Sequence, residues 1–198
     1  MIVLALDTST RVTSVALRAP SGTLVRTEEV PPAESILGLV DALLAEARLG
    51  RDAIELVVVG TGPGLFTGTR VGVATAKGLA MALDRPLLGV SSLDAVIAAA
   101  KADAAIIDAG RGEAYAKRRG ETAFLAAPAD ALAKLGEGCV ASASLGLDLP
   151  NAPGPDVAWL AEEGARHLAA GEPDARTTLE PDYVRPSDAQ LPKTPLRT

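Results

Sequence analysis

Four glycines lie in the stretch GTGPGLFTGTR, residues 60–70, between an apolar run and a stretch with helical spacing. Glycine between a strand and a helix often cradles a phosphate. A P-loop also needs a Gly-Lys pair, and the sequence contains none. A dinucleotide-binding turn needs a third glycine where this sequence has Thr67. The spacing therefore favours a structural corner, and it leaves Gly62 and Gly64 as candidate cofactor-binding residues.

The stretch DTST, which begins at Asp7, could do related chemistry at the end of the first apolar run. A carboxylate followed by hydroxyl groups can hold a metal-bound phosphate. The same residue types also form Asx and Ser/Thr turns, which cap a hairpin without any ligand. The hairpin cap is favoured because no glycine opens this turn to a phosphate. Asp7, Thr8 and Ser9 are nevertheless candidate cofactor-binding residues.

The sequence lacks the residues of the common metal and hydrolase sites. Its one histidine is His167 and its one cysteine is Cys139, too few for a zinc or iron cluster. No G-x-S-x-G motif occurs, so a Ser-His-Asp hydrolase would have no nucleophile elbow. We therefore expect no metal site, no catalytic residue and no cofactor.

The formal net charge of −6 bears on the partners of the chain. Proteins that bind nucleic acid alone usually carry a basic face, and the basic cluster at 117–119 is short. We therefore expect no direct binding of nucleic acid. No signal peptide or membrane-spanning stretch is found, and a single cysteine fits a reducing compartment. These features predict a cytoplasmic protein without membrane contact.

Apolar runs and turn residues predict an α/β protein. The first half is expected to form strands at 2–9, 13–19, 22–30, 55–60 and 85–91 and helices at 34–50, 69–83 and 92–101. The second half is expected to form a strand hairpin within 103–120, helices at 128–136 and 156–171, and a strand at 139–142. Each half opens with a hairpin whose first strand ends in an aspartate, Asp7 or Asp108, which indicates a duplicated architecture.

The predicted domains follow this division: an N-terminal lobe at 1–103, a smaller C-terminal lobe at 104–185 and a disordered tail at 186–198. The tail has three prolines and little to bury, which is typical of disorder.

Five stretches in a fixed order carry a family resemblance: IVLALDTST, GTGPGLFTGTRVGVATAKGLA, GVSSLDA, IDAGRGEAYA and LEPDYVRP. Together they resemble the TsaB (YeaZ) family from residue 1 to about 186. The resemblance implies an actin-like ATPase fold of the sugar kinase and Hsp70 type, with two related lobes of mixed sheets flanked by helices. It also implies a non-catalytic subunit that supports the TsaD transferase in forming threonylcarbamoyladenosine at position 37 of tRNA.

The implied partners are TsaD in a heterodimer, the ATPase TsaE in a larger complex, and a second copy when the chain is alone. The first predicted helix has a broad apolar stripe, and the second has small residues that permit close approach. The candidate partner-binding residues are Ile36, Leu37, Leu39, Val40, Leu43, Leu44, Val71 and Thr75. Two alternatives stay open: the stripe is buried within one lobe, or the chain is an actin-like small-molecule kinase or ATPase acting alone.

Overall fold

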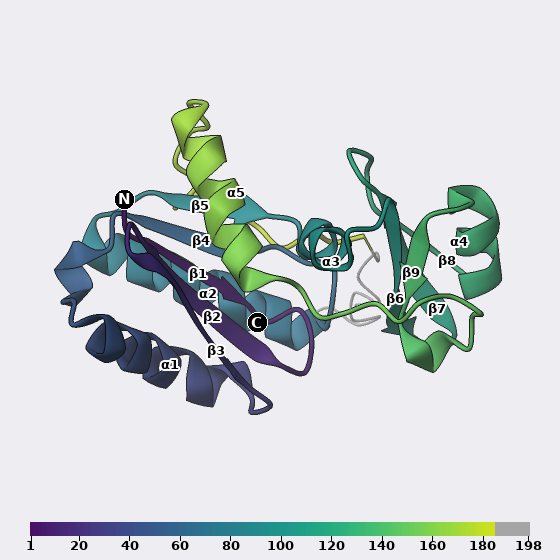
Figure 1. The fold of residues 1–198 in the computed structure, drawn as a ribbon, viewed down its shortest axis with the longest axis horizontal. Helices are drawn as coiled ribbons and strands as arrows, with labels where there is room; N and C mark the ends of the chain where they lie inside the picture. The colour runs from purple at the N-terminus through teal and green to yellow at the C-terminus, as the bar shows by residue number, and fades with distance from the viewer. Residues whose placement is uncertain (185–198) are drawn as a thin grey trace, which may run out of the picture.

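The structure, a computed structural model, describes residues 1–184 and contains two mixed β-sheets side by side (Figure 1). The first sheet has the order β3-β2-β1-β4-β5. Its strands are β1 (Val3–Asp7), β2 (Thr13–Ala19), β3 (Gly22–Glu28), β4 (Leu56–Gly60) and β5 (Leu87–Val90). Strands β1, β2 and β3 form an antiparallel meander, while β4 and β5 continue the sheet in parallel with β1.

Helices cover both faces of the first sheet (Figure 1). The helices and helical turns of this lobe are α1 (Pro32–Ala47), η1 (Arg51–Ala53), α2 (Phe66–Leu83), α3 (Ser92–Ala100) and α5 (Val157–Ala169). Helices α1 and α2 pack on one face with Leu4, Leu6 and Val57, and α5 packs on the other with Val3 and Val58. Because both faces are buried, β1 and β4 read as continuous apolar runs.

The second sheet repeats the first in a shorter form. Its elements are β6 (Ala104–Gly110), β7 (Glu113–Arg118), β8 (Phe124–Ala126), α4 (Pro128–Leu135), β9 (Cys139–Ala141) and the turn η2 (Ala143–Leu145). The order is β8-β7-β6-β9, with an antiparallel meander and a parallel fourth strand beside the first. The path β6-β7-β8-α4-β9 thus matches β1-β2-β3-α1-β4, and the expected duplication is present.

The chain returns to the first lobe after the second sheet. Helix α5 lies in the range assigned to the C-terminal lobe by sequence, but it packs on the first sheet through Leu160 and Ala161. The segment after α5 then runs along the outer edge of β5, where Ala175 N donates to Leu87 O at 2.9 Å and Leu87 N donates to Asp174 Oδ1 at 3.0 Å. The domain boundaries stay a prediction, and the tail at 186–198 lies outside the described residues.

Several elements differ from the sequence prediction: α1 spans Pro32–Ala47 rather than 34–50, and the turns η1 and η2 are additional. Strand β8 was not predicted, because its three residues are too few to show a period of two. Helix α2 begins at Phe66 rather than 69. The sequence contains no signal for this start, because the N-cap residue Leu65 makes no side-chain hydrogen bond and the first turn contains Thr67 and Gly68. None of the helices within residues 1–184 combines the length and apolar character needed to cross a bilayer.

Gly164 tests the packing of α5. A Cβ built at this glycine would collide with the side chain of Val58 in the middle of the sheet. We expect Gly164→Ala to lower the free energy of unfolding by about 1–3 kcal/mol, because the core must shift to admit the methyl group. Urea unfolding followed by circular dichroism measures the change.

The control is Gly38→Ala, at a helical glycine whose added Cβ would have no neighbour within 4 Å. This change should raise stability by about 0.5–1 kcal/mol, because alanine favours the helix. Equal effects of the two substitutions would contradict the packing of α5 on Val58.

Candidate functional site

The Asp7 turn is a buried, fully hydrogen-bonded hairpin cap. Asp7 ends β1 and is 1% exposed. Its Oδ1 accepts from Ser9 N at 2.9 Å and from Ser9 Oγ at 2.7 Å. Its Oδ2 accepts from Ser92 Oγ at 2.5 Å. Both carboxylate oxygens therefore have donors from the chain itself, and the bond from Ser9 N is that of an Asx turn.

The glycine loop closes over this turn. Thr8 Oγ1 donates to Gly68 O at 2.7 Å, and Leu65 N donates to Ser9 O at 2.7 Å. A Cβ added at Gly64 would collide with the Ser9 carbonyl, and one added at Gly72 would collide with Thr8 Oγ1. The glycines are thus needed because the backbone of the loop and of α2 lies against the turn.

The cofactor candidates from the sequence therefore come together at one place. Asp7, Thr8 and Gly62 are buried, and Gly62 N donates to Ser92 Oγ at 3.0 Å. Ser9 and Gly64 line an adjacent cleft. The sequence found these residues as two separate motifs, and the fold joins them through β1, β4 and α2.

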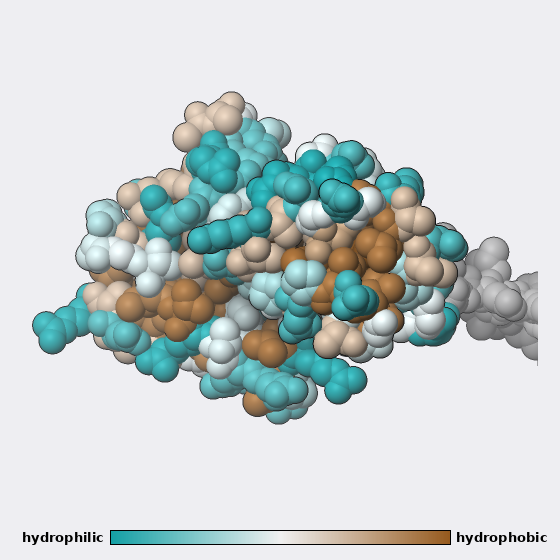
Figure 2. Space-filling model, turned by 45° about the vertical axis from the view of Figure 1, so that its right-hand side comes forward, coloured by the Kyte–Doolittle hydropathy of each residue, from teal (hydrophilic) through white to brown (hydrophobic). Residues whose placement is uncertain are grey.

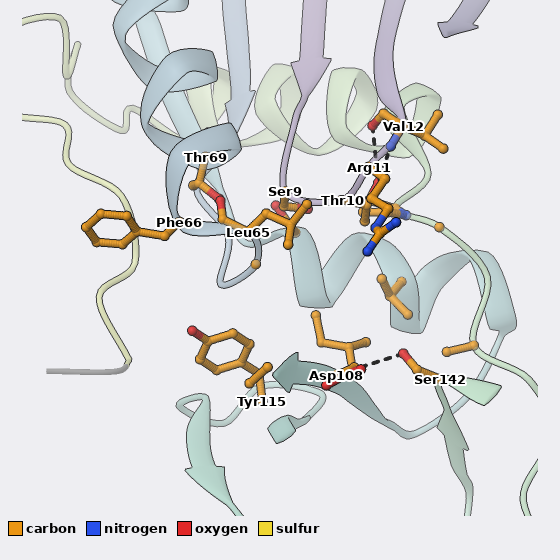
Figure 3. Close-up of a pocket in the computed structure, with 18 of the residues that line it drawn as sticks. Ser9, Thr10, Arg11, Val12, Leu65, Phe66, Thr69, Asp108, Tyr115 and Ser142 are labelled. Carbon is orange, nitrogen blue, oxygen red and sulfur yellow. Dashed lines mark hydrogen bonds between the residues drawn. The ribbon is translucent and has the colours of Figure 1, made fainter. Parts of the chain in front are cut away.

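The cleft lies between the two lobes and has a volume of about 1160 Å³. In Figure 3, Ser9, Thr10 and Arg11 face Asp108 and Tyr115 of the second lobe across it. Asp108 repeats the arrangement of Asp7: its Oδ1 accepts from Gly110 N at 2.7 Å and its Oδ2 from Ser144 Oγ at 3.0 Å. The turns after the two duplicated strands thus approach the same space.

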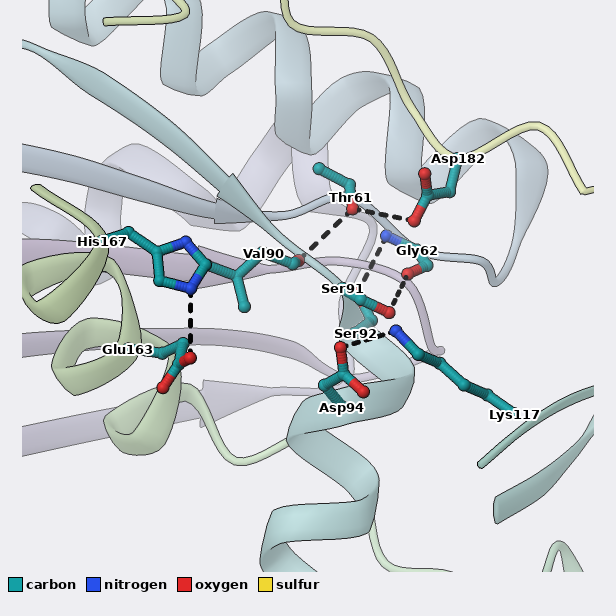
Figure 4. Close-up of polar contacts among 10 residues, drawn as sticks. All are labelled: Thr61, Gly62, Val90, Ser91, Ser92, Asp94, Lys117, Glu163, His167 and Asp182. Atoms are coloured by element: carbon teal, nitrogen blue, oxygen red, sulfur yellow. Dashed lines mark hydrogen bonds and ion pairs between the residues drawn. The ribbon is translucent and has the colours of Figure 1, made fainter. Parts of the chain in front are cut away.

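Three stretches of the sequence meet near this cleft. Thr61 of the glycine loop donates through Oγ1 to Asp182 Oδ2 at 3.1 Å, and Asp182 N donates to Thr61 O at 2.8 Å (Figure 4). A Cβ added at Gly89 would meet Leu179 and Thr61. The stretches GTGPGLFTGTR and GVSSLDA and the described part of LEPDYVRP, residues 179–184, are distant in sequence but therefore form one contact region. The sequence signals this contact only in that all three stretches are among the five that carry the family resemblance.

The comparisons with known proteins agree with this architecture. The family described as "TsaD: tRNA N6-adenosine threonylcarbamoyltransferase" matches residues 32–183. The crystal structure titled "YeaZ from Pseudomonas aeruginosa" superposes with a TM-score of 0.74 at 28% identity, over 92% of this chain and 99% of that one. A Haemophilus influenzae protein named "tRNA threonylcarbamoyladenosine biosynthesis protein TsaB" is 38% identical over 58% of this chain and 52% of its own length. The chain belongs to the TsaB/YeaZ family.

A second curated TsaB, from Escherichia coli, is 39% identical over 58% of this chain and 53% of its own length. The matches span about half the length of these curated relatives. A further Pseudomonas aeruginosa structure, of a protein described as similar to peptidase YEAZ, superposes with a TM-score of 0.77 over 93% of this chain and 99% of that one. The two related lobes of mixed sheets therefore have the YeaZ fold, and the expected actin-like ATPase class is confirmed.

Most of the candidate partner-binding residues of this TsaB/YeaZ chain lie in its own core. The buried members are Ile36, Leu39, Val40, Leu43 and Leu44. Leu39 is 4% exposed and packs in the first-lobe core, so this part of the broad apolar stripe is covered by the chain's own first lobe. Leu37 is 57% exposed, while Val71 and Thr75 are half-buried. A role of these residues in partner binding stays a prediction.

The outer face of α2 is the more open surface. Ala74, Gly78 and Ala82 are exposed, whereas Gly72, Ala76 and Ala80 face the sheet. A Cβ built at Gly78 would have no neighbour within 4 Å. The two small-residue ridges of this helix therefore differ, since one packs inward and the other is free to approach another molecule. Figure 2 shows one face of the molecule, on which hydrophobic areas are set among hydrophilic ones.

The charged residues singled out by sequence have structural contacts. His167 Nε2 lies 3.1 Å from Glu163 Oε1 (Figure 4). Lys117 forms an ion pair of 2.6 Å with Asp94 between the lobes, and Arg119 Nη2 donates to Ala102 O at 2.8 Å. Within residues 1–184, no group of three or more His, Cys, Asp or Glu side chains could hold a metal ion.

Because Asp7 is buried in the closed turn, the pH dependence of stability can test whether the turn is closed. Desolvation raises the pKa of its carboxyl above the ordinary value of 3.8, against the opposing effect of its bonds from Ser92 and Ser9. The folded chain thus holds this proton more tightly than the unfolded chain, so ionisation costs stability as pH rises past 3.8 and through the folded-state pKa. We expect the free energy of unfolding of Asp7→Asn to rise relative to that of the parent as pH rises from 3.8 toward the folded-state pKa of Asp7.

Urea unfolding of the parent and the Asp7→Asn variant across this pH range measures the gain. Asp148→Asn, at an exposed position, is the matched control. If the difference in free energy of unfolding between Asp7→Asn and the parent stays constant across this pH range, the Asp7 carboxyl does not titrate as a buried group.

Proposed function

We propose that the chain is a non-catalytic subunit that binds the TsaD transferase and supports the formation of threonylcarbamoyladenosine at position 37 of tRNA, in the cytoplasm. The observation that carries the proposal is the closed Asp7 turn. Both carboxylate oxygens of Asp7 accept bonds from the chain, and the glycine loop packs on Thr8 and Ser9. A phosphate or metal would have to displace these contacts to reach Asp7.

The named relatives support the pathway. Two of the curated matches are named tRNA threonylcarbamoyladenosine biosynthesis proteins, and the matching family is described as a tRNA N6-adenosine threonylcarbamoyltransferase. A chain with the transferase fold but a closed Asp7 turn is suited to pair with a related catalytic subunit. The exposed ridge of α2 and Leu37 of α1 form the surface proposed for TsaD and, in its absence, for a second copy.

The tRNA is proposed to contact other subunits of the complex, with TsaE as a third member. The chain has a formal net charge of −6, which opposes an independent contact with a polyanion. The short basic cluster does not change this, because Lys117 pairs with Asp94 and the guanidinium of Arg118 donates to backbone carbonyls at 135 and 137.

A kinase or ATPase acting alone is the second candidate, and the cleft of about 1160 Å³ favours it. We expect the isolated chain to show no ATP hydrolysis above a buffer blank, because the Asp7 carboxylate is already hydrogen-bonded and 1% exposed. A coupled assay with purified protein and Mg²⁺ measures this. Steady turnover that Asp7→Asn abolishes would establish the second candidate instead.

Leu37 tests the partner surface without disturbing the core. We expect Leu37→Glu to weaken association with TsaD and self-association by about tenfold or more. The contact would bury a carboxylate without a partner, which costs about 1.4 kcal/mol or more of binding free energy. Leu37 is 57% exposed, so the monomer should keep its fold. Light scattering after size-exclusion chromatography measures self-association, and biolayer interferometry measures TsaD affinity.

Val25→Glu is the matched control, because Val25 is 47% exposed on β3 and points to the sheet face opposite α1, since its neighbour Leu24 packs against the core that contains α1. Leu39→Glu would be a poor test, since it places a charge in the core of the first lobe. If Leu37→Glu and Val25→Glu both behave like the parent, the α1–α2 surface is not the contact.

A further inference from the structure

Arg70 of α2 is held between two exposed aromatic side chains. Its guanidinium carbon lies 3.7 Å from the ring centroid of Phe66 and 5.2 Å from that of Tyr183. Its Nε donates to Tyr183 Oη at 3.1 Å. Phe66 is 57% exposed and Tyr183 is 50% exposed. The stacking and the hydrogen bond fix the position of a cation that faces solvent.

This cluster joins two stretches that carry the family resemblance. Phe66 and Arg70 belong to the glycine loop and the start of α2, and Tyr183 belongs to LEPDYVRP. Tyr183 follows Asp182, whose bonds to Thr61 pin the segment in place. The three exposed side chains thus rest on a rigid base, although they add nothing to the buried core.

The cluster is continuous with the outer face of α2. At helical spacing, one exposed stripe runs along this helix, and we call it the α2 stripe: Thr67, Arg70, Ala74, Gly78 and Met81. The charged residues of α2 are Arg70 and Lys77, both basic, although the chain as a whole carries −6. The stripe therefore offers close approach along its length and a fixed positive charge near its N-terminal end.

We propose that Arg70, Phe66 and Tyr183 form an anchor that receives a carboxylate-bearing segment of the partner subunit. This inference rests on the proposed function and names the chemistry of the contact. A guanidinium binds a carboxylate through two parallel hydrogen bonds, and Nη1 and Nη2 are the nitrogens suited to it while Nε is bonded to Tyr183. Phe66 and Tyr183 exclude water around the pair, as aromatic residues do at the centres of interfaces.

The test compares Arg70 variants with the surface variant described above. We expect Arg70→Ala to weaken TsaD binding by about tenfold or more and to make the remaining affinity less dependent on salt. Arg70→Lys should fall between the parent and Arg70→Ala, because it keeps the charge and loses the fork. Tyr183→Phe should have a smaller effect, since it removes only the oxygen that accepts from Nε. Biolayer interferometry at several salt concentrations gives both readouts.

Arg166→Ala is the matched control, because this arginine is exposed on α5, on the opposite face of the sheet. A thermal melt of each variant separates loss of binding from loss of fold. The anchor is overturned if a folded Arg70→Ala chain binds TsaD with the affinity and salt dependence of the parent. If Leu37→Glu still weakens binding in that case, the proposed function stands. If the parent itself does not bind TsaD, both fail. If the chain binds single-stranded RNA and the binding is lost when Phe66 or Arg70 is replaced, the proposal that the ligand is a carboxylate is overturned.

Discussion

The closed contact between the Asp7 turn and the glycine loop is the constraint on which the rest of the first lobe depends. Asp7 ends the central strand β1, and its carboxylate is bonded to Ser92 at the start of α3. A Cβ at Gly60, the last residue of β4, would collide with the same carboxylate. The end of β1, the end of β4 and the start of α3 therefore meet at one buried carboxyl group. Helix α2 owes its depth on the sheet to this contact, because Gly68 and Gly72 lie directly on Thr8.

The duplicated lobes show how one supersecondary unit serves two purposes. The unit of a three-strand meander, a helix and a parallel strand occurs in both lobes. In the first lobe it is extended by α2, β5 and α3 and then covered by the returning helix α5. In the second lobe α4 covers one face of the small sheet, and α3 packs on the other face through Leu93, Val96 and Ile97. The larger lobe consequently has the buried aspartate, and the smaller one has the exposed turn at Asp108.

The sequence predicted where the strands and helices lie better than it predicted which of them pack against one another. Long apolar runs located β1 and β4, and the order of the hairpins indicated the duplication, because burial on both faces leaves a strong local signal. The stripe on α1 was correctly read as apolar, but periodicity alone does not tell a helix face covered by its own sheet from one covered by a partner. Leu39 belongs to the first case. The contact of Arg70 with Tyr183 joins residues 113 positions apart, so only the folded chain reveals it.

The segment that follows α5 has a consequence for how this protein can assemble. By donating Ala175 N to Leu87 O and accepting from Leu87 N, it occupies hydrogen-bonding groups along one border of the five-stranded sheet. A foreign strand cannot add there without first peeling this segment away. The opposite border, β3, has charged side chains at Arg26 and Glu28 that discourage strand addition. Growth of this five-stranded sheet into a larger ribbon is thereby opposed at both borders.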